Sequence, residues 1–349
     1  MSNTLEQTKG KFKIEGKVVG IKNENAFREG FTSSDKPYKS LQFFVQSSPT
    51  NRIKVEMFGM ERDEVIFYDS KEKKSSRVKW DKRNTDAVKG AKLLGTNMFL
   101  EGSGEKKTRK VMVEFDAIDY ILEHLKDDDS VRITGSIDFG EYEDNEGKKK
   151  NTVKFPIGSV TKIADIDFEA EDFKEVASFE QEIVVNDKEV DTETQKLLIS
   201  SYVINYNKEG NVAVGADFVV NGQVYPKLAN NMSKRLGFGD AIKVYGLIKN
   251  ETIQVEAPPE DVEEEEVDDW GGDEDIASEF DTNYINEYIN ELQVISVDSS
   301  SYEKSKYTED DFFSQEEDVF NGDVDEDEDE EEIDDLPFGW LTVSESENL

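Results

Sequence analysis

The stretch 71–110 concentrates side chains that can bind an anionic polymer. It holds 13 Lys and Arg against 5 Asp and Glu, a net charge of +8. Cations that follow the phosphates of a nucleic acid give an affinity that is independent of base sequence and falls with salt. The cationic candidates here are Lys71, Lys73, Lys74, Arg77, Lys79, Lys82, Arg83, Lys106, Lys107, Arg109 and Lys110.

Aromatic side chains near these cations can supply faces on which unpaired bases stack, at about 1–3 kcal/mol per base. The stacking candidates are Tyr38, Phe44, Phe58 and Trp80, with Lys36, Lys39 and Lys54 as flanking cations. Phe43 and Met57, one position before Phe44 and Phe58, are expected in the core because successive strand side chains point to opposite faces.

Three alternatives stay open for these residues. A lysine-rich hairpin can be a solvated element that protects a sheet edge. A register shifted by one residue would bury Phe44 and Phe58. Trp80 can instead cap the small core of its own hairpin.

Strands and one helix must position these side chains in the first half of the chain. Strands are expected at Lys11–Ile21, Tyr38–Gln46, Arg52–Gly59, Val65–Tyr68, Arg77–Trp80, Ser130–Ile137 and Val153–Ile163. Ile118, Ile121, Leu122 and Leu125 fall at helical spacing. Apart from the hairpin at 65–80, the order is three strands, a helix and two strands, which is typical of a five-stranded OB barrel.

A second unit repeats this order. Strands are expected at Phe179–Val185, Lys196–Tyr206, Val212–Val220, Gly239–Ile248 and Thr252–Glu256, with a helix at Lys227–Leu236. Residues 129–137 and 240–248 share Asp, apolar, basic and Gly residues at equal offsets, which indicates an internal duplication. Tyr202, Tyr206 and Tyr245 could stack with bases, although a structural or protein-binding role fits this unit equally well.

We therefore expect an all-β protein with two tandem OB barrels, each with a helix between strands 3 and 4. The expected parts are an arm at 1–10, a first barrel at 11–166 with a basic insertion at about 61–113, a second barrel at 172–256, and a disordered acidic tail at 257–349. Two unrelated small β domains are the alternative.

Charge separates the tail from the rest. Residues 1–160 have a net charge of +3, residues 161–256 of −7, and residues 257–349 of −34. A sequence this charged and poor in apolar residues does not bury a core. Within the tail, Ile285, Tyr288, Ile289 and Leu292 lie at helical spacing and predict a docking helix, with Thr282 as its cap.

Composition also excludes several classes. The chain has no cysteine, which excludes disulfides and thiolate metal sites. Its first residues lack the pattern of a signal peptide, and no apolar run reaches about 18 residues, so we expect a soluble protein of the cytoplasm.

The tail ends in an acidic run followed by Asp334, Asp335, Leu336, Pro337 and Phe338. This tip resembles the C-terminal tip of bacterial-type single-stranded DNA-binding proteins, and the tandem layout looks more like a bacteriophage version than a cellular one. The resemblance implies sequence-tolerant binding of single-stranded DNA, and docking of the tip onto replication, recombination and repair proteins, in a bacterial or infected host cell.

The tip departs from that family in one respect. In the family, Phe is the last residue and its carboxylate helps docking, whereas eleven residues from Gly339 to Leu349 follow here. Partners would then recognise the tip internally or also use Trp340 and Leu341. We expect no cofactor, and a monomer is the favoured oligomeric state.

Two other functions stay open as alternatives. His124, the single histidine, fits a helix surface better than a catalytic base, and neither a GxxxxGK[ST] loop nor an HExxH motif occurs. A metal-dependent nuclease needs only a few carboxylates and stays an alternative, as does an acidic chaperone or DNA mimic that binds basic proteins.

Overall fold

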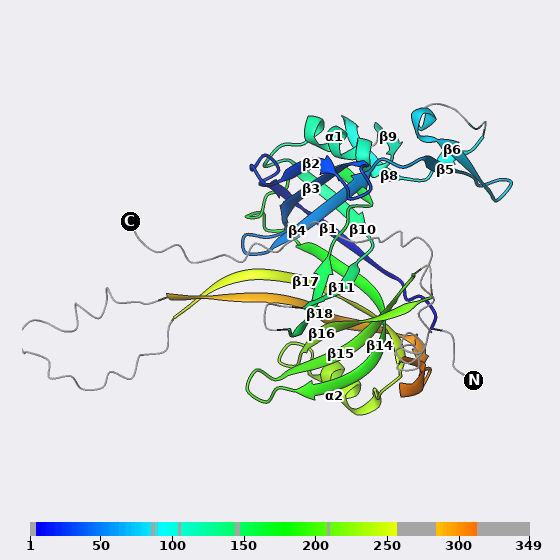
Figure 1. Cartoon of the computed structure of the whole chain (residues 1–349). Coiled ribbons are helices and arrows are strands. Elements are labelled where there is room, and N and C mark those ends of the chain that lie inside the picture. The colour runs from blue at the N-terminus through cyan, green and yellow to red at the C-terminus, as the bar shows by residue number, and fades with distance from the viewer. Residues whose placement is uncertain are drawn as a thin grey trace, which may run out of the picture.

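Strands dominate the protein in a computed structural model, which describes residues 5–84, 88, 90–103, 106–143, 147–207, 210–256 and 284–312 (Figure 1). Residues 334–338, the predicted docking tip, lie outside the described residues, as do Trp270 and Trp340. The prediction of an all-β protein is confirmed.

Unit 1, residues 10–162, contains a closed five-stranded barrel. The barrel strands are β1 (Gly10–Val19), β3 (Pro37–Gln46), β4 (Arg52–Met60), β10 (Ser130–Gly135) and β13 (Ser159–Lys162), and the unit also contains the short strand β2 (Phe27–Phe31) and helix α1 (Glu114–His124). Antiparallel pairs join β4 to β3, β3 to β1, β1 to β10 and β10 to β13, and β2 adds to the edge of β3. A parallel bridge between Glu56 and Pro156 closes the ring.

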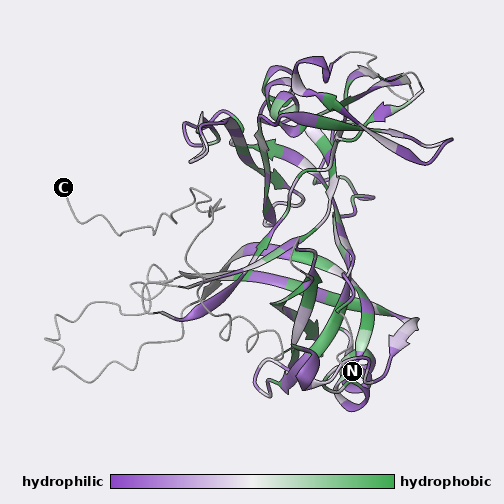
Figure 2. Cartoon of the chain, turned by 45° about the vertical axis from the view of Figure 1, so that its right-hand side comes forward, coloured by the Kyte–Doolittle hydropathy of each residue, from purple (hydrophilic) through white to green (hydrophobic). Residues whose placement is uncertain are grey.

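Successive side chains of each strand point alternately into the core and toward solvent, and the hydropathy of the strands in Figure 2 alternates accordingly. On β1, Phe12, Ile14 and Val18 are buried while Lys11 and Lys13 are exposed. On α1, Ile118 and Ile121 are fully buried, as their helical spacing predicts.

An insertion separates β4 from α1. It comprises β5 (Glu64–Asp69), β6 (Lys74–Lys79), η1 (Trp80–Lys82), β7 (Lys92–Leu93), β8 (Thr96–Ser103) and β9 (Lys106–Met112). Strands β5 to β7 form a separate three-stranded sheet, which we call the insertion module, and the expected hairpin at 65–80 is part of it. Strand β8 instead pairs with β13 and so widens the barrel sheet.

Unit 2, residues 176–312, has the same strand pairing as unit 1. Its elements are β14 (Val176–Val190), β15 (Lys196–Asn205), β16 (Val212–Asn221), α2 (Pro226–Arg235), β17 (Ala241–Glu256) and β18 (Tyr284–Glu303). Antiparallel pairs join β16 to β15, β15 to β14, β14 to β17 and β17 to β18. The parallel pair of Val219 with Gln293 closes this ring.

Strand β18 corrects two expectations. Residues 285–292 belong to a strand and not to a helix, and Leu292 is buried in the core. Residues 252–256 extend β17 and are not the last strand of the unit. Unit 2 therefore continues beyond residue 256, because the strand that closes it lies after the acidic segment 257–283.

The first strands of the two units join the barrels. Strand β1 pairs with β10 on one edge and with β14 on the other, so one sheet runs through both units. Phe12 lies opposite Gly135 and Phe179 opposite Gly246, and the two phenylalanines also lie opposite each other. The barrels are thus related by a local twofold axis at this pair.

Glycine is required at both equivalent positions. A Cβ on Gly135 would lie 2.0 Å from the carbonyl oxygen of Pro156 and 2.9 Å from the Phe12 ring. A Cβ on Gly246 would lie 2.2 Å from the carbonyl oxygen of Gln293 and 2.3 Å from the Phe179 ring. The shared glycine of the sequence repeat therefore makes room for a core phenylalanine in each barrel.

Candidate nucleic-acid interface

The outward face of β2, β3 and β4 carries exposed rings and cations. Phe43 and Met57 point into the barrel and are buried, as predicted, while Phe44 is 39% exposed. Phe44 lies opposite Lys54 across the β3–β4 pair, and Lys54 is exposed. The alternative register that would bury Phe44 is therefore wrong.

Tyr38 and Phe58 form a preassembled pair of rings on the same face. Their ring centroids are 5.6 Å apart with planes 27° from parallel, and both side chains are half-buried. Gly30 on β2 pairs with Tyr38, and a Cβ there would approach the Tyr38 ring to 3.1 Å. The small residue thus lets the ring lie flat on the sheet, with its outer surface available for stacking.

Strand β2 adds residues that the sequence analysis missed. Arg28 lies opposite Ser40 on this face and lines a small hollow with Phe58. Phe31 is 68% exposed but lies opposite Pro37, so it points to the other side of β2. The signal was the sequence Phe27–Phe31, in which two rings flank an arginine. This strand is short and follows a turn, so it was not recognised.

Two of the predicted flanking cations have carboxylate partners. Lys36 donates to Asp63 at 2.9 Å. Lys39 pairs with Asp119 on α1 and lies 4.5 Å from the Phe115 ring centroid. Their charge is partly compensated, so Lys54 is the predicted cation that lies most openly beside the rings.

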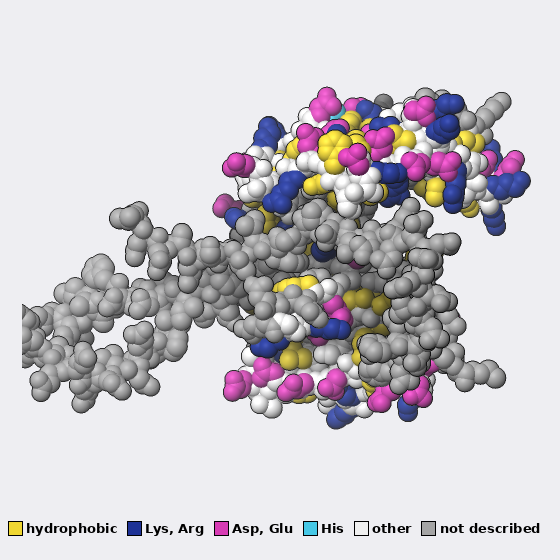
Figure 3. Space-filling model, in the orientation of Figure 1, with side chains coloured by type: hydrophobic (Ala, Val, Ile, Leu, Met, Phe, Trp, Pro, Cys, Tyr) yellow, Lys and Arg dark blue, Asp and Glu magenta, His cyan; other side chains and the backbone are white. Residues whose placement is uncertain are grey.

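The insertion module carries most of the predicted positive charge. Exposed cations on it are Lys71, Lys73, Lys74, Arg77, Lys79 and, in η1, Lys82. In Figure 3, Lys and Arg side chains gather around the outer end of the module, interspersed with carboxylates. Their exposure fits contact with phosphates.

Trp80 and Arg83 have structural roles. Trp80 is half-buried against the module core of Val65 and Phe67, and its ring meets Phe115 edge to face at 5.9 Å. Arg83 lies 4.2 Å from the Trp80 ring and donates two hydrogen bonds to Asp116, at 2.8 and 2.9 Å. These residues attach the module to α1, and the alternative of Trp80 as a hairpin cap is the one that the contacts support.

The second predicted cationic cluster lies on β9. Arg109 donates to Asn97, and Lys110 pairs with Glu101 at 2.7 Å while lying 4.6 Å from the Tyr120 ring centroid. Lys107 is half-buried, and the side chain of Lys106 lies outside the described atoms. This cluster covers the far edge of the barrel sheet and is not on the β2–β4 face.

The equivalent face of unit 2 is partly covered by unit 1. A hairpin of β11 (Asp138–Glu143) and β12 (Lys149–Lys154) reaches from unit 1 onto β16. Gly215 N–H donates to Glu141 at 2.9 Å, and Asn151 donates to Asp217 at 2.9 Å. Unit 2 therefore presents carboxylates and a foreign hairpin where unit 1 presents rings.

The tyrosines proposed for unit 2 are dispersed. Tyr202 stacks on Phe312 at 4.6 Å, so its ring belongs to a small terminal core. Tyr206 is largely exposed. Tyr245 lines a groove instead.

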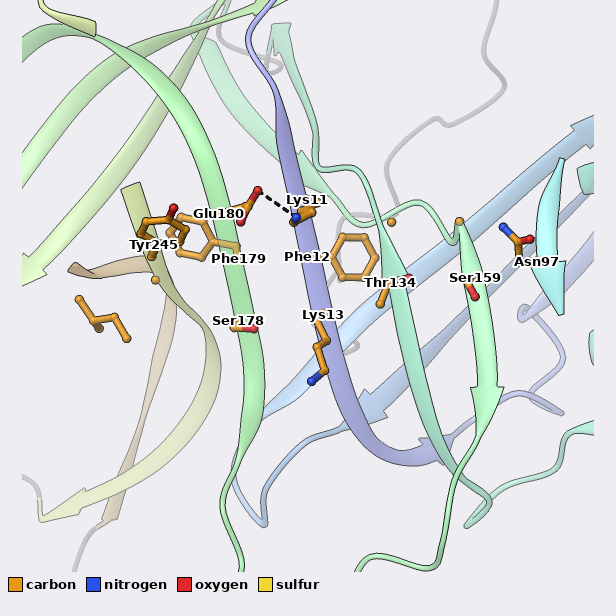
Figure 4. A pocket seen from close by; sticks show the side chains of 14 residues that line it. Lys11, Phe12, Lys13, Asn97, Thr134, Ser159, Ser178, Phe179, Glu180 and Tyr245 are labelled. Carbon is orange, nitrogen blue, oxygen red and sulfur yellow. Dashed lines mark ion pairs between the residues drawn. The ribbon is translucent and has the colours of Figure 1, made fainter. Parts of the chain in front are cut away.

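That groove, of about 680 Å³, is lined by residues of β8, β13, β10, β1, β14, β17 and β18 (Figure 4). Its two lysines are both paired, Lys11 with Glu180 at 3.1 Å and Lys13 with Glu15 at 3.0 Å. Paired lysines attract phosphates weakly, so the groove is a poorer candidate than the β2–β4 face.

Two further features bear on other functions. His124 stacks on Tyr120 at 4.0 Å and lies 3.2 Å from Glu101, in a packed position on α1. Among the described residues, no three His, Cys, Asp or Glu side chains are grouped to hold a metal ion, and no helix is long and apolar enough to cross a membrane.

Comparison with known proteins gives one family and a set of similar structures, two of which are described here. The family model described as YorF matches residues 9–333, and no curated protein matches the chain. The wild-type single-stranded DNA binding protein from Thermus aquaticus is 9% identical, with a TM-score of 0.37 over 84% of this chain and 93% of that one. A deletion mutant of the same protein is also 9% identical, with a TM-score of 0.36 over 85% and 95%.

Proposed function

The chain belongs to the YorF family, and we propose that it binds single-stranded DNA, largely independently of base sequence, and so protects unpaired strands from reannealing. The observation that carries this proposal is the outward face of β2–β4, where Phe44 lies opposite Lys54 and the Tyr38–Phe58 pair lies further along the same strands. Exposed rings next to cations on an OB-type sheet match the needs of unpaired bases and their phosphates.

The chemistry of this face favours single strands over duplex. Each stacked base contributes about 1–3 kcal/mol and any base can stack, whereas a duplex hides its base faces. The cations of the insertion module extend the positive surface beyond the rings and add affinity that falls with salt. We assign this role to unit 1, because the equivalent face of unit 2 carries Asp217 and the β11–β12 hairpin.

The acidic C-terminal segment is proposed to recruit replication, recombination or repair proteins in the cytoplasm. Residues 313–349 contain 16 Asp and Glu and no Lys or Arg, and their apolar side chains cluster around Leu336–Phe338. Leu336 and Phe338 would fill an apolar pocket on a partner, and the carboxylates would meet a basic rim.

A binding titration tests the DNA-binding proposal. Labelled oligo-dT is titrated with the full chain at two salt concentrations, and fluorescence anisotropy is read against a duplex and a mixed-sequence strand of equal length. We expect tight binding of both single strands at low salt, weaker binding at high salt, and the weakest binding for duplex. Equal affinity for duplex, or no binding at low salt, would contradict the proposal.

The same samples address the alternatives. Incubation with Mg²⁺ should leave the oligonucleotide intact, whereas cleavage would favour a nuclease. Binding of a basic protein such as a histone together with no oligonucleotide binding would favour an acidic chaperone.

A further inference from the structure

Ile66, Tyr68 and Leu94 form an exposed apolar patch on the outer face of the insertion module. Strand β5 is the middle strand of this sheet, and its Val65 and Phe67 point inward and are buried. The alternate side chains point outward, so Ile66 is 44% exposed and Tyr68 37%. Leu94, 53% exposed, adjoins them because its N–H donates to the carbonyl of Ile66.

Cations flank this apolar patch on both neighbouring strands. Arg77 lies opposite Ile66 on β6, and Lys92 lies opposite Tyr68 on β7. Lys79 extends the rim opposite Glu64. The Glu64 carboxylate lies 3.9 Å from Arg77 and offsets one of these three positive charges, so the rim keeps a net positive charge.

An apolar centre with a cationic rim fits an acidic segment that inserts apolar side chains. Two of the three exposed side chains are aliphatic, which favours packing against other apolar side chains over stacking with bases. Residues 331–341 of this chain have the complementary pattern, with four carboxylates among Ile333, Leu336, Pro337, Phe338 and Trp340.

We propose that the apolar patch of the insertion module is a docking surface for acidic–apolar segments, and that its occupant in this protein is its own C-terminal segment 331–341. This proposal does not depend on DNA binding. It gives the module an interaction with protein in addition to its cationic surface.

The chain is long enough for this contact. The described chain ends at residue 312, so 24 residues lead to Leu336. Fully extended they span on the order of 80 Å. A globule of this size is about 50 Å across, by the usual scaling of radius of gyration with length.

Energy transfer between two labels tests the docking directly. The chain has no cysteine, so Glu72→Cys at the module turn and Ser344→Cys in the tail give two unique attachment sites in the full chain. We expect strong transfer at low salt. Ile66→Ser with Leu94→Ser should lower it at least twofold, and so should Leu336→Ser with Phe338→Ser.

The control removes equally exposed apolar side chains elsewhere. Val190 and Leu198 in unit 2 are 51% and 40% exposed, and Val190→Ser with Leu198→Ser should leave transfer unchanged. Circular dichroism shows whether each variant is folded. Unchanged transfer in a folded Ile66→Ser/Leu94→Ser variant overturns the proposal.

Two more measurements separate other occupants. If transfer appears only between singly labelled chains that are mixed, a second copy provides the segment and docking within the chain is refuted. If the patch variant keeps full transfer but binds oligo-dT at least tenfold more weakly, the patch is a nucleic-acid site. If the patch variant loses transfer while its oligo-dT affinity equals that of the wild type, the docking proposal is supported. This holds whether the wild type binds oligo-dT tightly or weakly.

Discussion

Phe43 and Phe44 are consecutive residues whose side chains face opposite sides of strand β3. Phe43 is buried in the barrel, whereas Phe44 stands on the face beside Lys54. The sequence predicts this difference, because successive side chains of a strand point to opposite faces, and one face of a barrel strand lines the core while the other meets solvent. The same rule predicts Met57 inside and Phe58 outside.

The rings should dominate affinity. Tyr38→Ala and Phe44→Ala should each weaken binding of oligo-dT by about 5- to 150-fold, which corresponds to a stacking loss of about 1–3 kcal/mol. Tyr206→Ala removes an exposed ring from unit 2 and should leave affinity unchanged. Anisotropy titrations at one salt concentration compare the three variants; an equal loss in Tyr206→Ala would refute the assignment to unit 1.

Lys54 should act through charge alone. Lys54→Ala should weaken binding of all single strands equally, and should reduce the slope of log K against log salt by about 0.7. Arg83→Ala is the comparison, because Arg83 is committed to Asp116 and should change thermal stability while leaving the slope unchanged. A reduced slope in Arg83→Ala would show that Arg83 contacts phosphate.

Glu175 links the units through a pH-sensitive network. Ser47 and Asn51 of unit 1 donate to its carboxylate at 2.7 Å each, and Lys249 of unit 2 lies 3.2 Å away. Burial alone would raise the pKa of Glu175, but these hydrogen bonds and the charge of Lys249 outweigh burial and lower it.

A lowered pKa means that the carboxylate stabilises the folded state above the pKa of the unfolded chain, and that this stabilisation is lost as pH falls through the lower folded value. Glu175→Gln should therefore reduce the free energy of unfolding at pH 7, and the difference from wild type should shrink below about pH 4.5. Denaturant unfolding at pH 7, 5 and 3.5 measures it; a pH-independent difference would exclude the network.

For the strands and helices, sequence patterns predicted local secondary structure better than they predicted contacts between residues far apart in the sequence. The strands of unit 1, helix α1 and the module hairpin follow alternation and helical spacing. Strand β18 was missed because Ile285, Ile289 and Leu292 also fit helical spacing, and because its pairing with β17 spans the 27 residues 257–283. The carboxylate partners of Lys39 and Arg83 could likewise not be predicted, because they lie 80 and 33 residues away in the sequence.

Truncation distinguishes the two boundaries of unit 2. A chain that ends at residue 256 lacks β18 with its buried Leu292 and Val294, and leaves β17 with an open edge. We expect it to aggregate or to lose cooperative unfolding, whereas a chain that ends at residue 312 should unfold like the full chain. Circular dichroism melting compares them; a cooperative, soluble 1–256 chain would show that β18 is dispensable.

The whole molecule combines two similar barrels that are not used alike. One continuous core and one sheet run through both units, and the β11–β12 hairpin covers the face of unit 2 that corresponds to the aromatic face of unit 1. Charge is divided similarly, since residues 313–349 carry only carboxylates as charged side chains. We expect such a tethered polyanion to compete with DNA for the cations of unit 1, because tethering gives it a high effective concentration.

Removal of residues 313–349 should therefore raise the affinity for oligo-dT, most strongly at low salt, where the competition is least screened. Anisotropy titrations of the full chain and the truncated chain over a salt series measure this effect. The same affinity for both chains at every salt concentration would show that the acidic segment does not compete.

Strand β1 is hydrogen-bonded along both edges, to β10 of its own barrel and to β14 of the other. A hinge between the barrels would have to break that ladder, so unit 2 keeps a constant orientation relative to the face of unit 1 that we propose for DNA. On a long single strand, each bound molecule should accordingly cover the same number of nucleotides.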